Sequence, residues 1–288
     1  MTGFSCPMNA DQYTPWSLAT VDRRAIRGDN PYMALAIDLR GRVALITGAT
    51  GELGRVMART FAAAGADLAV HYHGNAEKAA SLVRELKAVG VRAAAFQADV
   101  GSLDSIMAMR DAVRKELGDP DIVVANAVAQ IHPWDTVLDE DISDYESQFR
   151  TCVLQNVHLA KAFIPAMKER QRGRYIGINT ECTMQMLPTQ SAYVSGKRGM
   201  DGVLRVLAQE VGPDQITVNQ VAPGWTISER YRHEGTTGDE DYVAAVPMRR
   251  RVTDQEVANV VAFLASDLAS FITGTYLPVC GGNVMPRV

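Results

Sequence analysis

Short apolar runs alternate with longer amphipathic stretches from residue 42 onward. The apolar runs predict strands at 42–47, 67–72, 92–97, 121–125, 174–179, 215–220 and 275–279. The amphipathic stretches predict helices at 52–64, 75–89, 103–117, 139–169, 190–211 and 254–266. Strands separated by helices at these intervals are typical of a parallel sheet covered on both faces. We therefore expect an α/β fold with a doubly wound parallel sheet of about seven strands in three α/β/α layers.

Two segments depart from this alternation. Residues 1–38 contain Pro7, Pro15 and Pro31 but no apolar segment followed by a cleavage site, so we do not expect a secretory signal there. We expect either an extension that lies over the domain or a neighbouring subunit, or a disordered leader. The polar stretch from Trp225 to Val246 follows a strand and predicts a lid over the C-terminal edge of the sheet.

Composition narrows the function classes. The chain has 288 residues, 47% of them hydrophobic, which is enough for one large core. The formal net charge is −4, without a Lys/Arg block or an apolar run of membrane length, so we expect neither nucleic-acid nor membrane binding. The four cysteines are widely spaced without a metal-ligand pattern: Cys6, Cys152, Cys182 and Cys280. Free thiols in a reducing cytoplasm are the simplest interpretation, and we expect no metal.

Three glycines follow the first predicted strand. Gly48, Gly51 and Gly54 make a tight turn between the apolar run Val43–Ile46 and the helix that begins near Glu52. Such a turn lets main-chain N–H groups and the helix N-terminus meet a pyrophosphate. The position of the turn between a strand and a helix predicts a Rossmann-type sheet, with residues 39–288 as a single dinucleotide-binding and catalytic domain.

Tyr193 and Lys197 stand four residues apart on a predicted helix. Their side chains therefore leave the same face and can act on one substrate atom. A tyrosine hydroxyl has an ordinary pKa near ~10, and an adjacent ammonium favours its phenolate. The pair predicts a tyrosine that exchanges a proton with the substrate.

Together these features resemble the short-chain dehydrogenase/reductase family, in its single-domain form of about 250 residues, across about residues 40–283. Landmarks in the family's order are Thr47-Gly48 to Gly54, Asp99-Val100, Asn126-Ala127, Thr180, Tyr193 with Lys197, Asn219, Pro223-Gly224 and Ile272-Thr273-Gly274. The resemblance implies an NAD(P)(H)-dependent oxidoreductase that interconverts a secondary alcohol and a carbonyl.

The resemblance also implies individual roles. Tyr193 would be the proton donor or base, Lys197 would hold the ribose hydroxyls and lower the tyrosine pKa, and Thr180 would orient the substrate oxygen where the family has serine. Asp99 would accept from the adenine amino group, and Asn126 would line the adenosine side. The implied cofactor-binding set is Gly48, Thr50, Gly51, Glu52, Leu53, Gly54, Tyr72, His73, Asn75, Asp99, Val100, Asn126, Ala127, Lys197, Pro223, Gly224, Thr226 and Ser228.

Three positions depart from the family's pattern. Glu52 replaces a frequent glycine, and Val128 replaces the glycine of Asn-Asn-Ala-Gly. Cys152 takes the place of the asparagine that completes the family's catalytic tetrad. In the family that asparagine acts largely through its main-chain carbonyl, which cysteine still offers. We therefore count Cys152 with the catalytic residues and expect reduced or retained activity, with a nucleophilic thiol as the alternative.

The end of the second strand bears on the choice of cofactor. Tyr72 stands where NAD-preferring members carry an acid that binds the ribose diol. Without a carboxylate there, His73 and Asn75 could hold a 2′-phosphate, although the usual nearby arginine is missing. We expect NADP(H) rather than NAD(H), and we interpret His71 as a core or sheet-edge histidine.

Three loops at the C-terminal ends of the strands should form the substrate pocket. They offer the predicted substrate residues His132, Trp134, Glu181, Gln190 and Trp225, together with Gln185, Glu229 and Arg230. This polar set favours a small hydroxylated or charged substrate, such as a sugar or sugar acid. The run Arg249–Arg251 could attract an anionic substrate, but a charged lead-in to the last helix explains it better.

Two rival functions remain open. A 3-oxoacyl-thioester reductase is the alternative within the same class. A cofactor-binding regulator with little catalysis is the alternative from another class, motivated by Glu52, Val128 and Cys152. Under either dehydrogenase interpretation the partner is a small-molecule carbonyl or alcohol. The family builds its contacts on the two long helices, so the resemblance implies a homotetramer or homodimer.

Overall fold

A seven-stranded parallel sheet forms the centre of the molecule. The computed structural model describes residues 36–129, 134–235 and 238–285, and residues from Ile37 onward form one compact unit. The expectation for residues 1–38 therefore lies almost entirely outside the described residues. The sheet has the order β3-β2-β1-β4-β5-β6-β9, built from β1 (Val43–Ile46), β2 (Asp67–Tyr72), β3 (Ala93–Gln97), β4 (Ile122–Ala125), β5 (Gly173–Ile178), β6 (Ile216–Pro223) and β9 (Tyr276–Val279). The predicted parallel sheet is confirmed.

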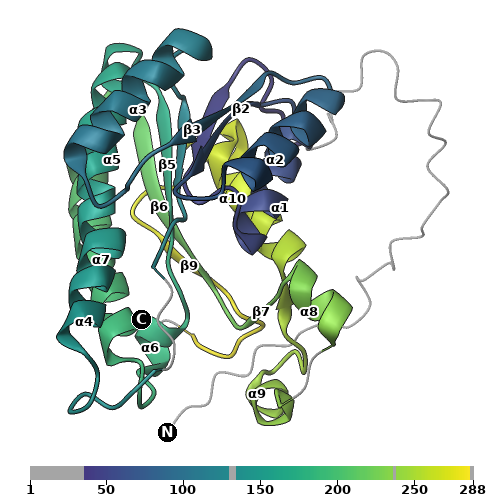
Figure 1. The fold of residues 1–288 in the computed structure, drawn as a ribbon, viewed down its shortest axis with the longest axis vertical. Helices are drawn as coiled ribbons and strands as arrows, with labels where there is room; N and C mark the ends of the chain where they lie inside the picture. Colours follow the sequence, from purple (N-terminus) through teal and green to yellow (C-terminus); the bar gives the residue numbers. More distant parts are fainter. Residues whose placement is uncertain (1–35, 130–133, 236–237, 286–288) are drawn as a thin grey trace, which may run out of the picture. The chain divides into compact units, whose positions relative to one another are not determined.

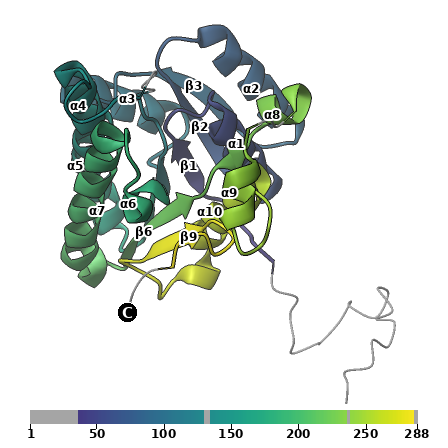
Figure 2. The ribbon, with the colours of Figure 1, turned by 90° about the horizontal axis from the view of Figure 1, so that it is seen from below.

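Helices cover both faces of the sheet, as Figures 1 and 2 show. One layer contains α1 (Glu52–Ala63), α2 (Ala76–Ala88) and α10 (Asp254–Ala265); the other contains α3 (Leu103–Glu116), α5 (Gln155–Glu169) and α7 (Ser191–Val211). Each layer buries its own apolar cluster against the sheet, with Phe61 in the first and Phe163 in the second. Within the described part of the chain, no helix is long and apolar enough to cross a membrane.

The strand order reverses beside β1. Ile46 pairs with Val70 of β2 on one side and with Val124 of β4 on the other, in parallel register. Every residue of β1 and β4 is buried, because helices cover both faces of these strands. The loops after β1 and β4 leave in opposite directions, which opens the crevice where doubly wound sheets bind ligands.

The predicted helix 139–169 is interrupted. It consists of α4 (Ile142–Gln148), a π-helical segment η2 (Phe149–Leu154) and α5. The Thr151 hydroxyl donates to the Ser147 carbonyl, and the Gln155 amide donates to the Thr151 carbonyl. Side-chain hydrogen bonds thus satisfy main-chain carbonyls in this segment. An amphipathic pattern does not reveal one extra residue in a turn, so the sequence predicted a continuous helix.

The stretch after β6 folds over the sheet's C-terminal edge, as predicted for a lid. It contains β7 (Thr226–Ile227), α8 (Glu229–Glu234) and α9 (Glu240–Ala245), and β7 pairs in parallel with β8 (Val252–Thr253). A short helix α6 (Cys182–Gln185) follows β5 and lies at the same end of the sheet (Figure 1). Short 3₁₀ turns occupy Gly212–Asp214 and Asp267–Ala269.

Candidate active site

Helix α7 carries Tyr193 and Lys197 at the C-terminal edge of the sheet. The Lys197 side chain is buried, and its Nζ donates to the Ile178 carbonyl at the end of β5 (2.6 Å). The same Nζ lies 5.9 Å from the centre of the Tyr193 ring. The two residues therefore lie on one side of α7, as their spacing predicted.

Tyr193 is enclosed on several sides. Trp134, from the loop after β4, stacks on its ring with centroids 5.7 Å apart and an angle of 26° between the planes. Burial raises the pKa of Tyr193 above its ordinary value, the Cys182 and Cys152 thiols act in the same direction, and a hydrogen bond with Thr180 opposes them. The net shift is opposite to the one expected from Lys197, whose ammonium is held on the Ile178 carbonyl. The hydroxyl is therefore protonated at rest, as a proton donor requires.

Thr180 is held in place by residues that the sequence did not single out. The Tyr276 hydroxyl donates to the Thr180 carbonyl (2.6 Å), and the Asn179 side chain accepts from the Thr180 main-chain N–H (2.9 Å). The Asn179 amide in turn donates to the Lys197 carbonyl (3.1 Å) and to Gln220 (2.8 Å). One buried amide thus links the segment of Thr180 to the helix of Tyr193 and Lys197. A polar residue directly after an apolar strand was the available signal for Asn179.

Cys152 lies in the π-helical segment and is 1% exposed. Its thiol donates to the Gln148 side chain (3.6 Å), and its main-chain carbonyl accepts from the Asn156 amide (2.6 Å). Asn156 is fixed by the Tyr175 hydroxyl, which donates to its side-chain oxygen (2.8 Å). Burial raises the pKa of the Cys152 thiol, although the Lys197 charge opposes this. The thiol is therefore a poor nucleophile.

The glycine turn after β1 is closely packed. A side chain at Gly54 would place its Cβ 2.2 Å from the Gly48 oxygen, so only glycine fits, and Gly48 has a φ of +61°. The Gly48 N–H donates to Nδ1 of His71 (2.9 Å), and Nε2 of that ring faces the Ala98 carbonyl (3.1 Å). Burial lowers the pKa of His71 to about 4, so the ring is neutral and donates from Nε2. His71 is a core histidine, as interpreted, and it also braces the turn.

Asn126 and Ala127 meet this turn at the end of β4. Their main-chain N–H groups donate to the Thr47 hydroxyl (2.9 and 3.0 Å), and the Asn126 amide donates to the Thr47 carbonyl (2.9 Å). The Thr47 hydroxyl itself donates to the buried Gln155 (2.8 Å). The Asn126 amide therefore ties two strand ends together, and Gln155 is a supporting residue that the sequence did not indicate.

The end of the sheet at β2 and β3 presents the side chains expected near adenosine. Asp99, His73 and Asn75 are exposed, while Tyr72 is half-buried and Val100 is buried. The Asp99 carboxylate accepts from the Gly101 N–H (2.8 Å), and Asn75 caps α2 by accepting from the Lys78 N–H (2.9 Å). Thr50 and Glu52 are partly exposed at the start of α1, with Leu53 behind them.

The residues after β6 fit a bound dinucleotide. The Ser228 hydroxyl is buried without a hydrogen-bond partner, in the place where the resemblance puts a contact with the cofactor. Pro223 ends β6, and Gly224 passes so close to the lid that a Cβ would lie 2.6 Å from the Tyr242 hydroxyl. Thr226 donates to the Gly224 carbonyl (2.9 Å). A bound polar group would satisfy the orphaned Ser228 hydroxyl.

A pocket of about 900 Å³ opens beside Tyr193 and Thr180. Of the predicted pocket residues, Trp134, Glu181, Gln185, Gln190 and Trp225 line it, and Val128 does too. His132 and the Arg230 side chain lie outside what the structure describes. The lid adds residues that the sequence analysis missed: Tyr231, Asp241, Tyr242 and, from the C-terminal segment, Asn283. The pocket is therefore more aromatic than the polar set predicted from sequence.

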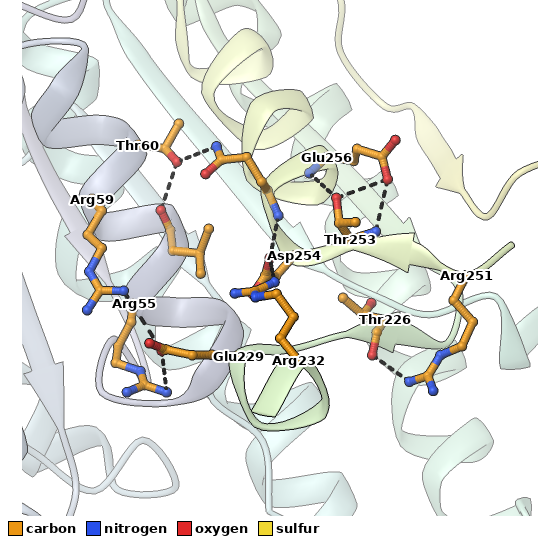
Figure 3. Close-up of polar contacts among 12 residues, drawn as sticks. Arg55, Arg59, Thr60, Thr226, Glu229, Arg232, Arg251, Thr253, Asp254 and Glu256 are labelled. Atoms are coloured by element: carbon orange, nitrogen blue, oxygen red, sulfur yellow. Dashed lines mark hydrogen bonds and ion pairs between the residues drawn. The ribbon is translucent and has the colours of Figure 1, made fainter. Parts of the chain in front are cut away.

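Other predicted pocket residues have partners elsewhere. Glu229 of α8 forms an ion pair with Arg55 of α1 (3.1 Å) and does not line the pocket (Figure 3). Arg250 pairs with Glu256 (2.6 Å) at the start of α10, and the buried Arg251 pairs with Asp239 (3.1 Å). The arginine run thus leads into α10, as favoured, and does not attract an anion into the pocket.

The sequence is also similar to those of known proteins whose names describe them as reductases. A family model described as "Enoyl-(Acyl carrier protein) reductase" matches residues 48–283. The chain is 34% identical over 251 residues to the 3-oxoacyl-[acyl-carrier-protein] reductase FabG of Staphylococcus aureus, covering 84% of this chain and 98% of that protein. The chain belongs to the short-chain dehydrogenase/reductase family.

Solved structures of such reductases have the same fold. A 7α-hydroxysteroid dehydrogenase in complex with NADH and 7-oxo glycochenodeoxycholic acid matches with a TM-score of 0.79 and 30% identity, over 87% of this chain and 97% of that one. A blue fluorescent protein from a metagenomic library, in complex with NADPH, matches with a TM-score of 0.79 and 27% identity, over 86% of this chain and all of that one. This short-chain dehydrogenase/reductase is accordingly an oxidoreductase that acts on alcohol and carbonyl groups with a nicotinamide dinucleotide.

Proposed function

We propose that the enzyme reduces a ketone to a secondary alcohol with NADPH, with Tyr193 as the proton donor. The observation that carries this proposal is the convergence of Tyr193 and Thr180 on one pocket, with Lys197 behind them. Cys152 in the asparagine position is compatible with it, because its main-chain carbonyl is already held by Asn156.

The protein's own groups account for the proton transfer. When bound, the nicotinamide supplies the hydride that the carbonyl carbon accepts. Thr180 orients the carbonyl oxygen, and the protonated Tyr193 hydroxyl donates to it as negative charge develops there. Trp134 stacks on Tyr193 and shields it from solvent. Holding the carbonyl beside this hydroxyl lowers the barrier by proximity.

NADP(H) is proposed over NAD(H) because no carboxylate ends β2. Tyr72 closes that strand, and the exposed His73 and Asn75 follow it. A 2′-phosphate would therefore meet no repelling charge there. Glu52, at the first turn of α1, is an acidic side chain of the predicted cofactor set and opposes an anion there.

The second candidate is a 3-oxoacyl-thioester reductase, favoured by the similarity to FabG. The pocket supports a ketone flanked by apolar or aromatic surface better than the sugar or sugar acid expected from sequence, because five aromatic side chains line it. We also propose a cytoplasmic location, supported by the free thiols of Cys152, Cys182 and Cys280.

The test is oxidation of NADPH and NADH with a panel of ketones, keto acids, sugars and acyl thioesters, comparing wild type with Tyr193→Phe. Phenylalanine keeps the ring that stacks on Trp134 but lacks the hydroxyl. We expect kcat/KM to fall at least about 100-fold, because the general acid is lost. Full activity of Tyr193→Phe would refute the proposal. Cofactor binding without turnover of any carbonyl would favour the regulator.

Cys152→Ala is the companion variant in the same assay. It removes the thiol and keeps the main-chain carbonyl that Asn156 holds. We expect kcat/KM within about tenfold of wild type, because the buried thiol takes no part in the reaction. A loss as large as that of Tyr193→Phe would instead assign the thiol a catalytic role.

A further inference from the structure

A buried carboxylate lies in the pocket wall next to the catalytic residues. Glu181 follows Thr180 directly and is 3% exposed. Its Oε1 accepts from the Tyr242 hydroxyl (2.7 Å) and its Oε2 from the Asn283 amide (3.1 Å). These donors are neutral, and no ion pair among the described residues includes Glu181. Burial raises the pKa of this carboxyl, while hydrogen bonds with Tyr242, Asn283 and the Trp225 main chain oppose the rise. A buried carboxylate without a counter-charge is costly, and a cation bound in the pocket would offset that cost.

A second acceptor in the same pocket has no partner. Gln190 lines the pocket at the start of α7, and its Oε1 is buried without a hydrogen bond. A buried acceptor left unpaired loses its hydration without compensation. A ligand that carries N–H or O–H donors would satisfy this oxygen. A cationic donor on the substrate would therefore pair the Gln190 oxygen and give Glu181 the counter-charge that it lacks.

The rest of the wall suits a cation. Trp134, Tyr193, Trp225, Tyr231 and Tyr242 place aromatic rings around the pocket, and aromatic faces attract cations. Asp241 adds a carboxylate on the exposed side, and the lining contains no Lys or Arg within the described part of the chain.

Arg251 packs against two of these rings, and its charge is already paired. Arg251 packs 4.3 Å from the Trp225 ring and 4.4 Å from the Tyr231 ring, so these rings already bind a cation on one side. It pairs with Asp239 (3.1 Å) and donates to the Trp225 and Thr226 carbonyls. Arg251 is 2% exposed, so it cannot serve as a counter-ion for Glu181 in the pocket.

The charge that develops during ketone reduction also favours a substrate that carries a cation. Hydride transfer to a carbonyl carbon places negative charge on the oxygen until the Tyr193 proton arrives. An uncompensated Glu181 carboxylate beside Thr180 opposes that charge, whereas a substrate cation between them offsets it. An anionic substrate would add to the repulsion.

We propose that the substrate is a ketone that carries a protonated amine, which Glu181 and Gln190 bind inside this pocket. This proposal rests on the ketone-reducing function proposed above and names its substrate class. When bound, NADPH would supply the hydride to the carbonyl carbon; Tyr193 would donate its proton to the oxygen and regain one from solvent, while the ammonium stays unchanged. The amino alcohol and NADP⁺ leave.

The test compares three ketones of similar shape with the full-length enzyme and NADPH. They are N-methyl-4-piperidone, which carries the amine; 4-methylcyclohexanone, its neutral carbon analogue; and 4-oxocyclohexanecarboxylate, which is anionic. We expect wild type to prefer the amine over the carbon analogue by at least about tenfold in kcat/KM, and to use the anion least. Glu181→Gln should abolish this preference, measured as the ratio of kcat/KM for the amine to kcat/KM for its carbon analogue within the variant.

Glu240→Gln is the matched control. Glu240 is exposed on α9, next to the pocket residues of that helix but outside the lining, so its loss should leave the preference for the amine intact. Equal kcat/KM for the amine and its carbon analogue in wild type would overturn the substrate assignment and leave ketone reduction standing. If Glu181→Gln does not fold, Gln190→Met removes the second acceptor and should reduce the same preference.

A binding measurement separates the two proposals. Trp134 and Trp225 line the pocket, so their fluorescence reports occupancy without turnover. N-methylpiperidin-4-ol should bind at least about tenfold more tightly than 4-methylcyclohexanol to wild type, but not to Glu181→Gln. That result without reduction of any ketone would support the amine site and refute the proposed function. Equal binding of the two alcohols would overturn the amine site.

Discussion

Individual buried polar residues fix the geometry of the catalytic and glycine-rich segments. Asn179 joins the segment of Thr180 to α7, and His71 joins the glycine turn to Ala98, the residue that follows β3. Each is satisfied on more than one atom, which is the condition under which a buried polar group stabilises a single arrangement. Asn179 and His71 therefore support the proposed site residues without being among the described residues that line the pocket.

The neutral His71 makes stability depend on pH. Its pKa is lowered from 6.5 to about 4 in the folded protein, so between these values the unfolded chain binds a proton that the folded chain does not. Unfolding free energy should therefore fall as pH drops from about 6.5 to 4, by up to about 3 kcal/mol. In His71→Asn, the side-chain oxygen can still accept from Gly48 but cannot titrate, so denaturant melts should show a flatter pH profile.

His158→Asn, at a half-buried histidine of α5, is the control for this measurement. It should keep the wild-type slope. The same slope in His71→Asn as in wild type would show that other groups cause the decline.

Helix α8 is held against the domain by ion pairs of two kinds, one buried on one side and the other partly exposed (Figure 3). Arg232 makes two hydrogen bonds to the carboxylate of Asp254 (2.7 and 2.8 Å), whose side chain is 2% exposed. Glu229 contacts Arg55 and Arg59 of α1 across a partly exposed surface (3.1 and 3.9 Å). The position of the lid is therefore stabilised more by the ion pair with Asp254, at the start of α10, than by the contacts with α1.

Removing Arg232 should loosen the lid. Arg232→Ala leaves the buried Asp254 without its cation, and we expect a loss of about 2 kcal/mol in unfolding free energy. Glu229→Gln removes only a surface pair and should cost less than about 1 kcal/mol. Thermal or denaturant unfolding would compare them, with limited proteolysis to locate the opening. A larger loss of unfolding free energy for Glu229→Gln than for Arg232→Ala would show that the contact with α1 holds the lid more strongly.

At the scale of the whole molecule, the strand order brings distant segments to one edge. Glu181, Tyr242 and Asn283 follow different strands and meet in one pocket wall. On another face, α5 and α7 leave an apolar groove lined by Val157, Ile164, Val203 and Leu207, with Val206 57% exposed. An exposed apolar face of this kind fits the proposed homodimer or homotetramer contact.

Val206→Glu tests that contact. We expect wild type to sediment as a dimer or tetramer, and the variant to dissociate into smaller species, because a buried carboxylate without a partner opposes association. Val89→Glu is the matched control, since Val89 is 64% exposed just beyond α2. Wild type that sediments as a monomer, or a variant with unchanged mass, would exclude this face as the interface.

The sequence by itself determined the alternating strands and helices, the glycine turn and the Tyr193–Lys197 pair, because these depend on periodicity and on spacing within one element. Only the tertiary structure decided which residues of different elements come into contact. The π-helical segment around Cys152, the support of Thr180 by Tyr276, and the aromatic wall around Glu181 join residues far apart in the chain. A local sequence pattern cannot predict such contacts, because the contacts form only when the sheet brings separate loops to the same edge.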